Sequence, residues 1–352
     1  MSNIFSQDNS LNSTLAFTKN QVDRITALWA FSEAAFGGIL HALKIPFTGL
    51  FVGGAAVIFI SLIAFYSNKS TAILKSTLLV VLIKFIISPY TPINAYFSVF
   101  VEAFLGILLF GIIKHHVLAS LLLGIGSLLF SAFQKLLVIT ILFGNTIWES
   151  IDIFINYVIN IFITSSEVSI TFSYFLIGLY IILHLSGGVI AGITAGKIPN
   201  WINHFSGEID YNKIIPVAEI KSKKEKRKRK SWLQKKSGIL LIVMALALVF
   251  LSYFGNEFEN NLPLNILIMF VRSILITTLW FLIVSPIATK FLQKYLNTKK
   301  SSYSGELENV LNLLPEMKAI VKYSWERSND KRGLSRLKIF SSYLFVIILR
   351  KG

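Results

Sequence analysis

The chain has 352 residues, of which 54% are hydrophobic and only 15% are charged, and its mean hydropathy is +0.66. Soluble proteins carry about 25% charged residues, so this composition excludes an ordinary soluble domain and indicates a membrane protein. The lack of cysteine excludes disulfides, thiolate metal sites and a cysteine nucleophile. The net charge of +16 suits either nucleic acid or an anionic membrane surface.

Eight apolar stretches follow a polar N-terminal segment, and each is long enough to cross a bilayer, which takes about 20 helical residues. Residues 1–24 hold acidic side chains and do not have the pattern of a secretory signal. Because unpaired backbone groups cannot face lipid, every stretch predicts an α-helix. The predicted spans are residues 25–43, 46–66, 71–88, 95–113, 117–143, 170–193, 238–254 and 263–287.

The loops between these spans alternate in charge. With the N-terminus inside, the inner side receives Lys19, Arg24, Lys69, Lys114, Lys197, the basic run 221–236 and Lys290, Lys294, Lys299 and Lys300. The outer side receives Glu149, Asp152, Glu167, Glu257, Glu259 and one lysine, Lys44. The positive-inside rule therefore predicts a multi-pass protein of the cell (inner) membrane with both termini in the cytoplasm. The basic run is then expected to touch lipid headgroups rather than nucleic acid.

The basic run also divides the chain. We predict a cytoplasmic N-terminal tail (1–24), a six-helix membrane unit (25–197), a basic linker (198–237), a transmembrane hairpin (238–290) and a cytoplasmic or interfacial helical tail (291–352). Apolar residues between 307 and 321 recur at helical spacing, and Pro315 is expected to kink that helix or to start another. Residues 339–349 are too few to span, so we expect them to lie in the interface or dock on the hairpin. The predicted fold is an all-α integral membrane protein.

A stripe of small side chains follows the first span. Ala30, Ala34, Gly38 and Ala42 recur every fourth residue and share one helix face. No hydrophobic force draws helices together in lipid, so close backbone approach between small residues governs their packing. The stripe is expected either to pack inside the bundle or to dock on another membrane subunit. Similar stripes stand at Gly49 and Gly53 on the second span and at Gly188, Gly192 and Gly196 on the sixth.

Six ionisable side chains lie inside the predicted spans of the six-helix unit, where charge is costly and usually marks function. They are Glu33, His41, Lys84, Glu102, Lys135 and His184. Glu33 and His41 share a helix face, and Lys84 and Glu102 lie on successive antiparallel spans, where they could form an ion pair. We expect the set to bind a substrate; the alternative is a set of pairs that neutralise one another. Arg272 on the last span has no evident partner.

No catalytic motif accompanies these residues. The chain lacks a metal-protease helix motif, a Gly-x-Ser-x-Gly elbow and a phosphate loop. We therefore expect no enzyme activity and no cofactor, and ATP-driven transport would need separate ATPase subunits. Two other functions stay open. In an ion-coupled secondary transporter, Glu33, Glu102 and Lys84 would form a relay; in a non-transporting membrane scaffold, the linker and tail would recruit cytoplasmic partners.

The six-helix unit resembles the substrate-binding membrane subunit, or S component, of the energy-coupling factor transporters. The resemblance rests on its size, its six spans, Ala30-x-x-x-Ala34, Lys44-Ile-Pro-Phe-Thr-Gly-Leu-Phe-Val-Gly-Gly54 and Ser88-Pro-Tyr-Thr-Pro-Ile-Asn-Ala-Tyr96. It implies that the small stripe docks on a coupling membrane subunit, that separate ATPase subunits supply energy, and that the substrate is a vitamin-like small molecule or a metal ion. It does not say which of these the chain would take.

The C-terminal part is similar, more distantly, to the coupling (T) subunit of the same transporters. Leu314-Pro315 is followed by Lys331-Arg332-Gly333 and Arg336. In that family an Ala-Arg-Gly motif on cytoplasmic helices meets the ATPase pair, and here Lys331 stands in place of the alanine. The resemblance implies a subunit interface at Arg332 and Gly333.

Overall fold

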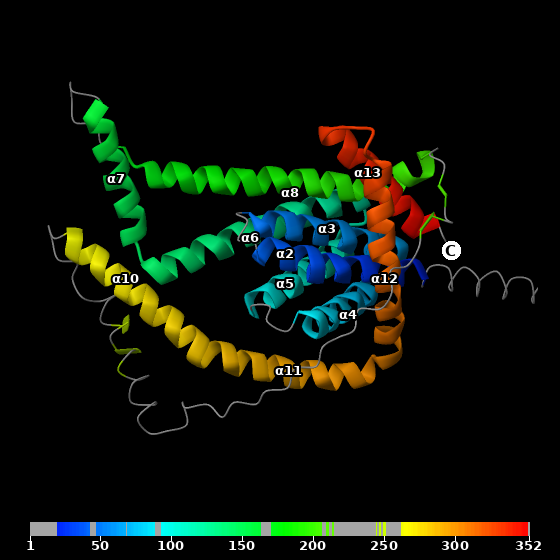
Figure 1. Ribbon diagram of the computed structural model, residues 1–352, viewed down its shortest axis with the longest axis horizontal. Coiled ribbons are helices and arrows are strands. Elements are labelled where there is room, and N and C mark those ends of the chain that lie inside the picture. The colour runs from blue at the N-terminus through cyan, green and yellow to red at the C-terminus, as the bar shows by residue number, and fades with distance from the viewer. Residues whose placement is uncertain are drawn as a thin grey trace, which may run out of the picture. The chain divides into compact units, whose positions relative to one another are not determined.

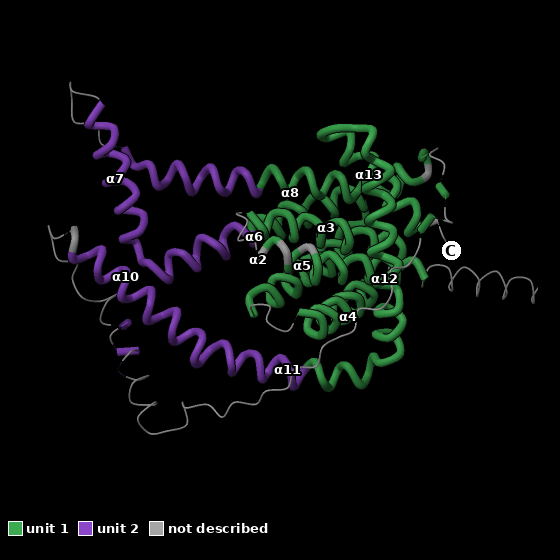
Figure 2. Tube along the Cα trace, viewed as in Figure 1, with its two compact units in different colours: residues 1–129, 185–223, 296–352 green, residues 130–184, 224–295 purple. Residues whose placement is uncertain are grey.

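A computed structural model describes the chain except for residues 1–19, 43–46, 68, 89–92, 163–169, 206–208, 211–212, 215–243, 245, 248, 251–261 and 351–352. Regular structure in the described residues is helical throughout (Figure 1). The chain forms two compact units (Figure 2). Unit 1 comprises residues 1–129, 185–223 and 296–352, and unit 2 comprises residues 130–184 and 224–295.

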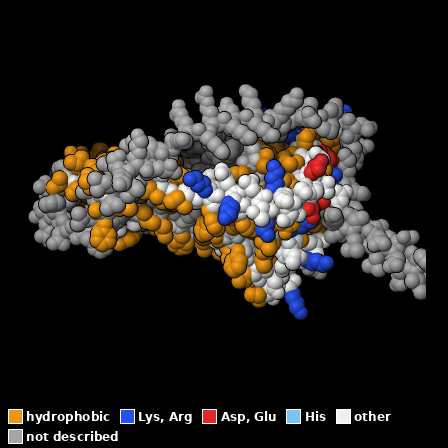
Figure 3. Space-filling model, turned by 90° about the horizontal axis from the view of Figure 1, so that it is seen from below, with side chains coloured by type: hydrophobic (Ala, Val, Ile, Leu, Met, Phe, Trp, Pro, Cys, Tyr) orange, Lys and Arg blue, Asp and Glu red, His pale blue; other side chains and the backbone are white. Residues whose placement is uncertain are grey.

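Among the residues that the structure describes, six helices are long and apolar enough to cross a membrane. Five of them are α3 (Thr48–Ser67), α4 (Ser70–Ile87), α5 (Ile93–Ile112), α6 (His116–Phe143) and α8 (Phe172–His204). The sixth is the continuous run Leu264–Ser302, built from α10 (Leu262–Leu279), the π-helical turn η4 (Trp280–Val284) and α11 (Ser285–Ser302). Exposed apolar side chains cover broad areas of the surface, as the face in Figure 3 shows. The predicted all-α, multi-pass membrane class is confirmed.

Two of the eight predicted spans stand apart from these six. Of residues 238–254 only 244, 246–247 and 249–250 are described, and all five are helical. The rest of that span, and most of the basic run 221–236, lie outside the described residues. The last predicted span does not end its helix at residue 287, because α11 continues to Ser302 and carries all four lysines that follow the span.

The first predicted span forms a helix that is largely buried among other helices of unit 1. Residues 20–31 are α-helical and continue through a π-helical turn, η1 (Ser32–Phe36), into α2 (Gly37–Ala42). The N–H of Gly37 donates to the carbonyl of Ser32, five residues earlier, which defines the wider π turn. Residues 24–30 are buried, and η1 packs against both α3 and α4. This helix therefore lies in the core of unit 1.

The glycine stripe on α8 brings two helices into backbone contact. A Cβ added at Gly188 would lie 2.6 Å from the carbonyl oxygen of Gly124 on α6, and one added at Gly192 would lie 2.6 Å from Cα of Leu121. Gly196 meets Cα of Val117 in the same way, at 2.9 Å. All of these positions belong to unit 1. The predicted close packing through small residues is confirmed for α8, with α6 as its partner.

The C-terminal helices are part of the bundle and do not form a separate tail. α12 (Ser304–Arg327) passes through Pro315 as one helix and packs on α4, and α13 (Gly333–Arg350) packs on α12. The proline therefore neither ends the helix nor starts another. Residues 344–349 are buried. The predicted boundary at 291 differs from the structure, in which residues 296–352 share a unit with the first helices.

Polar groups of the first helix hold the end of α13. The Gln21 amide donates to the carbonyl of Leu349 at 2.7 Å, and Arg24 Nε donates to that of Ile348 at 2.9 Å. Arg24 also pairs with Glu316 at 3.2 Å. The last carbonyls of a helix have no partners within it, so buried donors from elsewhere must satisfy them. The expectation that residues 339–349 lie in the interface or dock on the hairpin is therefore wrong.

Unit 2 contains α7 (Thr146–Phe162), the amphipathic helix between the fifth and sixth predicted spans. Its Asp152 accepts hydrogen bonds from the backbone N–H of Ser173 at 2.6 Å and from the Ser173 hydroxyl at 2.7 Å, which satisfies donors at the start of α8. Arg272 on α10 donates to the carbonyl of Phe143, at the end of α6. A cation at a helix C-terminus is favourable, so Arg272 has the partner that its sequence did not reveal.

Candidate functional site

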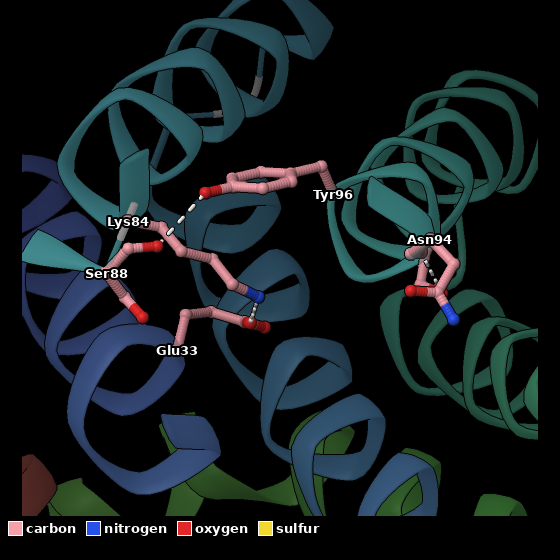
Figure 4. A network of polar contacts seen from close by, with 6 residues as sticks. Glu33, Lys84, Ser88, Asn94 and Tyr96 are labelled. Atoms are coloured by element: carbon pink, nitrogen blue, oxygen red, sulfur yellow. Dashed lines mark hydrogen bonds and ion pairs between the residues drawn. The ribbon is translucent and has the colours of Figure 1, made fainter. Parts of the chain in front are cut away.

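A buried ion pair joins the first helix to α4. Lys84 Nζ lies 2.7 Å from Glu33 Oε2, and the side chains are only 5% and 2% exposed (Figure 4). Glu33 stands in the π-helical turn η1, and Lys84 stands in the last turn of α4, against which η1 packs. π turns inside α-helices occur frequently at functional sites. The pair thus combines a costly buried charge with an irregular backbone.

The expected pairing of Lys84 with Glu102 is wrong, and the depth of the two residues explains why. Lys84 stands three residues before α4 ends at Ile87, whereas Glu102 stands nine residues after α5 begins at Ile93. At 1.5 Å per residue, the two differ in depth by about 9 Å along antiparallel helices. Tyr96, only three residues into α5, lies level with the lysine instead.

The aromatic ring of Tyr96 lies next to the ion pair. Lys84 Nζ lies 5.7 Å from the centroid of the Tyr96 ring, within the range of a cation–π interaction. The Tyr96 hydroxyl donates to the carbonyl of Ser88 at 3.4 Å, which ties the start of α5 to the end of α4 (Figure 4). Tyr96 was not among the predicted site residues. The sequence feature that could have identified Tyr96 is its position at the end of the Ser88–Tyr96 stretch between two spans.

Glu102 is a buried carboxylate on the same face of α5. Glu102 is only 4% exposed. Within the described residues, its carboxylate accepts no hydrogen bond. A Cβ added at Gly53 of α3 would lie 3.0 Å from Glu102 Oε1, so the glycine leaves room for this carboxylate. The charges of Glu33 and Lys84 both act on it. We call Glu33, Lys84 and Glu102 the charged cluster.

The structure brings together three of the six predicted binding residues. Lys135 and His184 belong to unit 2, whereas the charged cluster lies in unit 1. Lys135 is exposed, whereas His184 is fully buried, with its Nδ1 2.9 Å from the carbonyl of Tyr180 and its ring 4.3 Å from the Tyr180 ring. His41 lies in α2, and its side chain lies outside the described part of the structure.

The small stripe of the first helix divides into buried and open positions. Ala30 is fully buried and Ala34 nearly so, which means that these two pack inside unit 1. A Cβ added at Gly38 would meet open space. The side chain of Ala42 lies outside the description. Internal packing therefore accounts for the first half of the stripe, and docking through Gly38 and Ala42 stays a prediction.

The turn between α12 and α13 forms an exposed tip that contains Arg332 and Gly333. Gly333 has a φ of +58°, a left-handed conformation that glycine adopts without strain. Leu334 is 85% exposed, and the guanidinium of Arg336 lies 3.9 Å from the centroid of the half-exposed Trp325 ring. Apolar and basic groups are thus both accessible at this tip.

Comparison of the chain with family models, curated proteins and solved structures found no match. Among the described residues, no group of three or more His, Asp or Glu side chains is arranged to hold a metal ion. The charged cluster joins buried acidic and basic groups with an aromatic ring on helices able to span a membrane. Charged side chains within membrane-spanning helices are costly and usually mark function.

Proposed function

We propose that the protein is the membrane-embedded substrate-capture subunit of an importer of the energy-coupling-factor type, with its solute bound at the charged cluster. The observation that carries this proposal is Glu102, a buried carboxylate beside an ion pair that is already complete. A charge within membrane-spanning helices is costly, so a carboxylate kept there without a direct partner favours a role in binding.

In this proposal each element has a distinct task. The Glu33–Lys84 pair fixes η1 against α4, and Glu102 and Tyr96 offer a carboxylate and a ring face from α5. The π-helical turn places Glu33 at the site, and such turns occur frequently at functional sites. In this proposal the protein lies in the inner membrane with both termini in the cytoplasm. The solute enters from outside.

Energy would come from partner proteins, because the chain carries no nucleotide-binding motif. A coupling membrane subunit and separate ATPase subunits are the proposed partners. The exposed tip with Arg332, Gly333 and Leu334 supports this assembly, because it presents a cation and an apolar side chain to a neighbour. Gly38 is the corresponding open position on the first helix.

Purification of the tagged chain in mild detergent tests this function. Native mass spectrometry of the wild type should detect one bound small molecule together with co-purified ATPase and coupling subunits. Glu102→Gln should lose the small molecule and keep the subunits, whereas Glu308→Gln, at an exposed position on α12, should keep both. A wild-type preparation free of both solute and subunits would contradict the proposal and favour a scaffold.

An ion-coupled secondary transporter is the second candidate, because a buried carboxylate such as Glu102 can also carry a proton across a membrane. The purified chain alone, reconstituted in liposomes with a pH-sensitive dye inside, separates the two. Solute added outside should leave the internal pH unchanged if transport needs ATPase subunits. Solute-dependent acidification that Glu102→Gln abolishes would select the carrier instead.

A further inference from the structure

The helical run built from α10, η4 and α11 is longer than the membrane core is thick. Its span Leu264–Ser302 has 39 residues, which at about 1.5 Å per residue is about 58 Å, whereas the hydrocarbon core of a bilayer is about 30 Å thick. Residues 264–289 contain one charged side chain, Arg272, and extend over about 39 Å. Because this part fills the core, the residues that follow it lie at the depth of the lipid headgroups.

One side of α11 carries cations next to apolar side chains at that depth. Lys290 and Lys294 are both exposed and stand four residues apart, so they share a side of the helix and are separated by about 6 Å along its axis. Ile287 and Phe291, on the same side, are 64% and 75% exposed. The sequence of α11 contains four lysines and no acidic residue. The helix itself therefore offers nothing to neutralise these two cations.

We propose that Lys290 and Lys294 form a binding site for the headgroup of an anionic phospholipid. The two ammonium groups reach the phosphate on flexible stems, and Ile287 and Phe291 pack against the glycerol region and the first acyl carbons. Tyr295, which is 40% exposed, stands at the same level, where aromatic rings with a polar tip are enriched. The site is separate from the charged cluster and does not depend on the proposed function.

The order of groups along α11 favours a lipid over a soluble anion or an acidic protein. The cations follow directly on a membrane span, and exposed apolar side chains precede and separate them. A soluble anion would contact Lys290 and Lys294 but leave Phe291 without a partner. A phospholipid presents its negative headgroup and its apolar chains in the same order as the helix presents lysines and apolar residues.

Site-specific photo-crosslinking in a bilayer tests the inference on the full-length protein. Phe291→p-benzoylphenylalanine keeps an aromatic side chain at the site and links it to the lipid that lies there. The protein is reconstituted in an equimolar mixture of phosphatidylglycerol, which is anionic, and phosphatidylcholine, which has no net charge. Mass spectrometry of the linked peptide then gives the ratio of the two lipids. Each lysine near an anionic headgroup should favour phosphatidylglycerol about fivefold, so the expected ratio for two lysines is about 25 to one.

Variants with the same photoreactive residue assign the preference to the two lysines. Lys290→Gln with Lys294→Gln should lower the ratio to about one, and Lys290→Arg with Lys294→Arg should keep it high. The matched control is Lys318→Gln with Lys322→Gln, which removes two exposed lysines at the same spacing from α12 and should leave the ratio unchanged. If the first variant does not fold, the salt dependence of the unsubstituted site decides, because 1 M salt should reduce a preference that comes from charge.

Three results would overturn the inference. The first is a ratio near one with both lysines in place, and the second is an equal fall in the ratio for the α12 control. The third is a cross-link to a protein instead of a lipid, which would assign this side of α11 to a partner subunit. None of these results bears on the solute proposed for the charged cluster.

Discussion

At the scale of single residues, the buried ion pair of Glu33 and Lys84 joins the first helix to α4, and Glu102 lies buried on α5. Glu33, Lys84 and Glu102 interrupt apolar runs, and all three are buried in unit 1. Their pairing depends on the shift of one helix along another, which no pattern within a single helix encodes. For this reason Lys84 meets Glu33 rather than Glu102, and the part played by Tyr96 emerged only from the packing of α4 on α5.

Breaking the buried ion pair from one side should be strongly destabilising. Lys84→Met leaves Glu33 buried without its partner, so the free energy of unfolding should fall by about 3–5 kcal/mol. The double variant Glu33→Gln with Lys84→Met should recover much of the loss, because neither charge remains. Denaturant titration in detergent micelles measures both changes.

The exposed pair of Lys322 and Glu326, 3.8 Å apart on α12, is the matched control. Lys322→Met should change the free energy of unfolding by less than about 0.5 kcal/mol, because solvent screens such pairs. A Lys84→Met variant no less stable than this control would show that the buried pair does not hold η1 against α4.

At the scale of helices, spacing predicted the packing faces but not their partners. Gly188, Gly192 and Gly196 stand on one face because a helix turns once every 3.6 residues, and that face is in close contact. That α6 lies opposite could not be read from α8 itself. The position of the C-terminal helices was predicted wrongly for a related reason. The apolar residues 344–349 have the pattern of an interfacial segment, but they are buried in unit 1.

Enlarging a glycine at the α6–α8 contact should separate the two helices. The methyl group of Gly192→Ala would lie 2.6 Å from backbone atoms of Ser120 and Leu121, which cannot move aside as a side chain would. We expect a loss of about 1–3 kcal/mol in the free energy of unfolding. Gly178→Ala on the same helix, where a Cβ meets open space, should stabilise the protein or leave it unchanged. Equal effects at the two positions would contradict the contact.

At the scale of the whole molecule, the sequence predicted membrane residence and helical class more successfully than domain boundaries. Hydropathy is a property of each segment by itself, so six of the spans could be recognised one at a time. The compact units, in contrast, are assembled from segments far apart in the chain, and α6, α8 and α11 each pass from one unit to the other. Boundaries drawn at loops could not anticipate such a division.

The link between the first helix and α13 should control local opening at the C-terminal end. Arg24→Met removes the donor to the Ile348 carbonyl and the partner of Glu316. An unsatisfied buried group costs about 1–3 kcal/mol, so amides of residues 344–349 should exchange with solvent about tenfold faster for each 1.4 kcal/mol lost. Hydrogen exchange with mass spectrometry measures the change.

Lys213→Met provides the control for this experiment, because Lys213 forms an exposed pair with Asp210 in the same unit. Its substitution should leave the exchange of residues 344–349 as in the wild type. Exchange that is also unchanged in Arg24→Met would mean that apolar burial alone fixes α13.

The hydrogen bonds from Gln21 and Arg24 join residues 328 and 324 positions apart. At about 5–20 residues per second, a ribosome needs roughly 15–65 seconds to make that stretch, so Arg24 is made long before its acceptor. Until residues 348 and 349 follow, the donors of the first helix have no α13 to bind. The joint between these two helices can therefore form only late, after the helices that lie between them in the sequence.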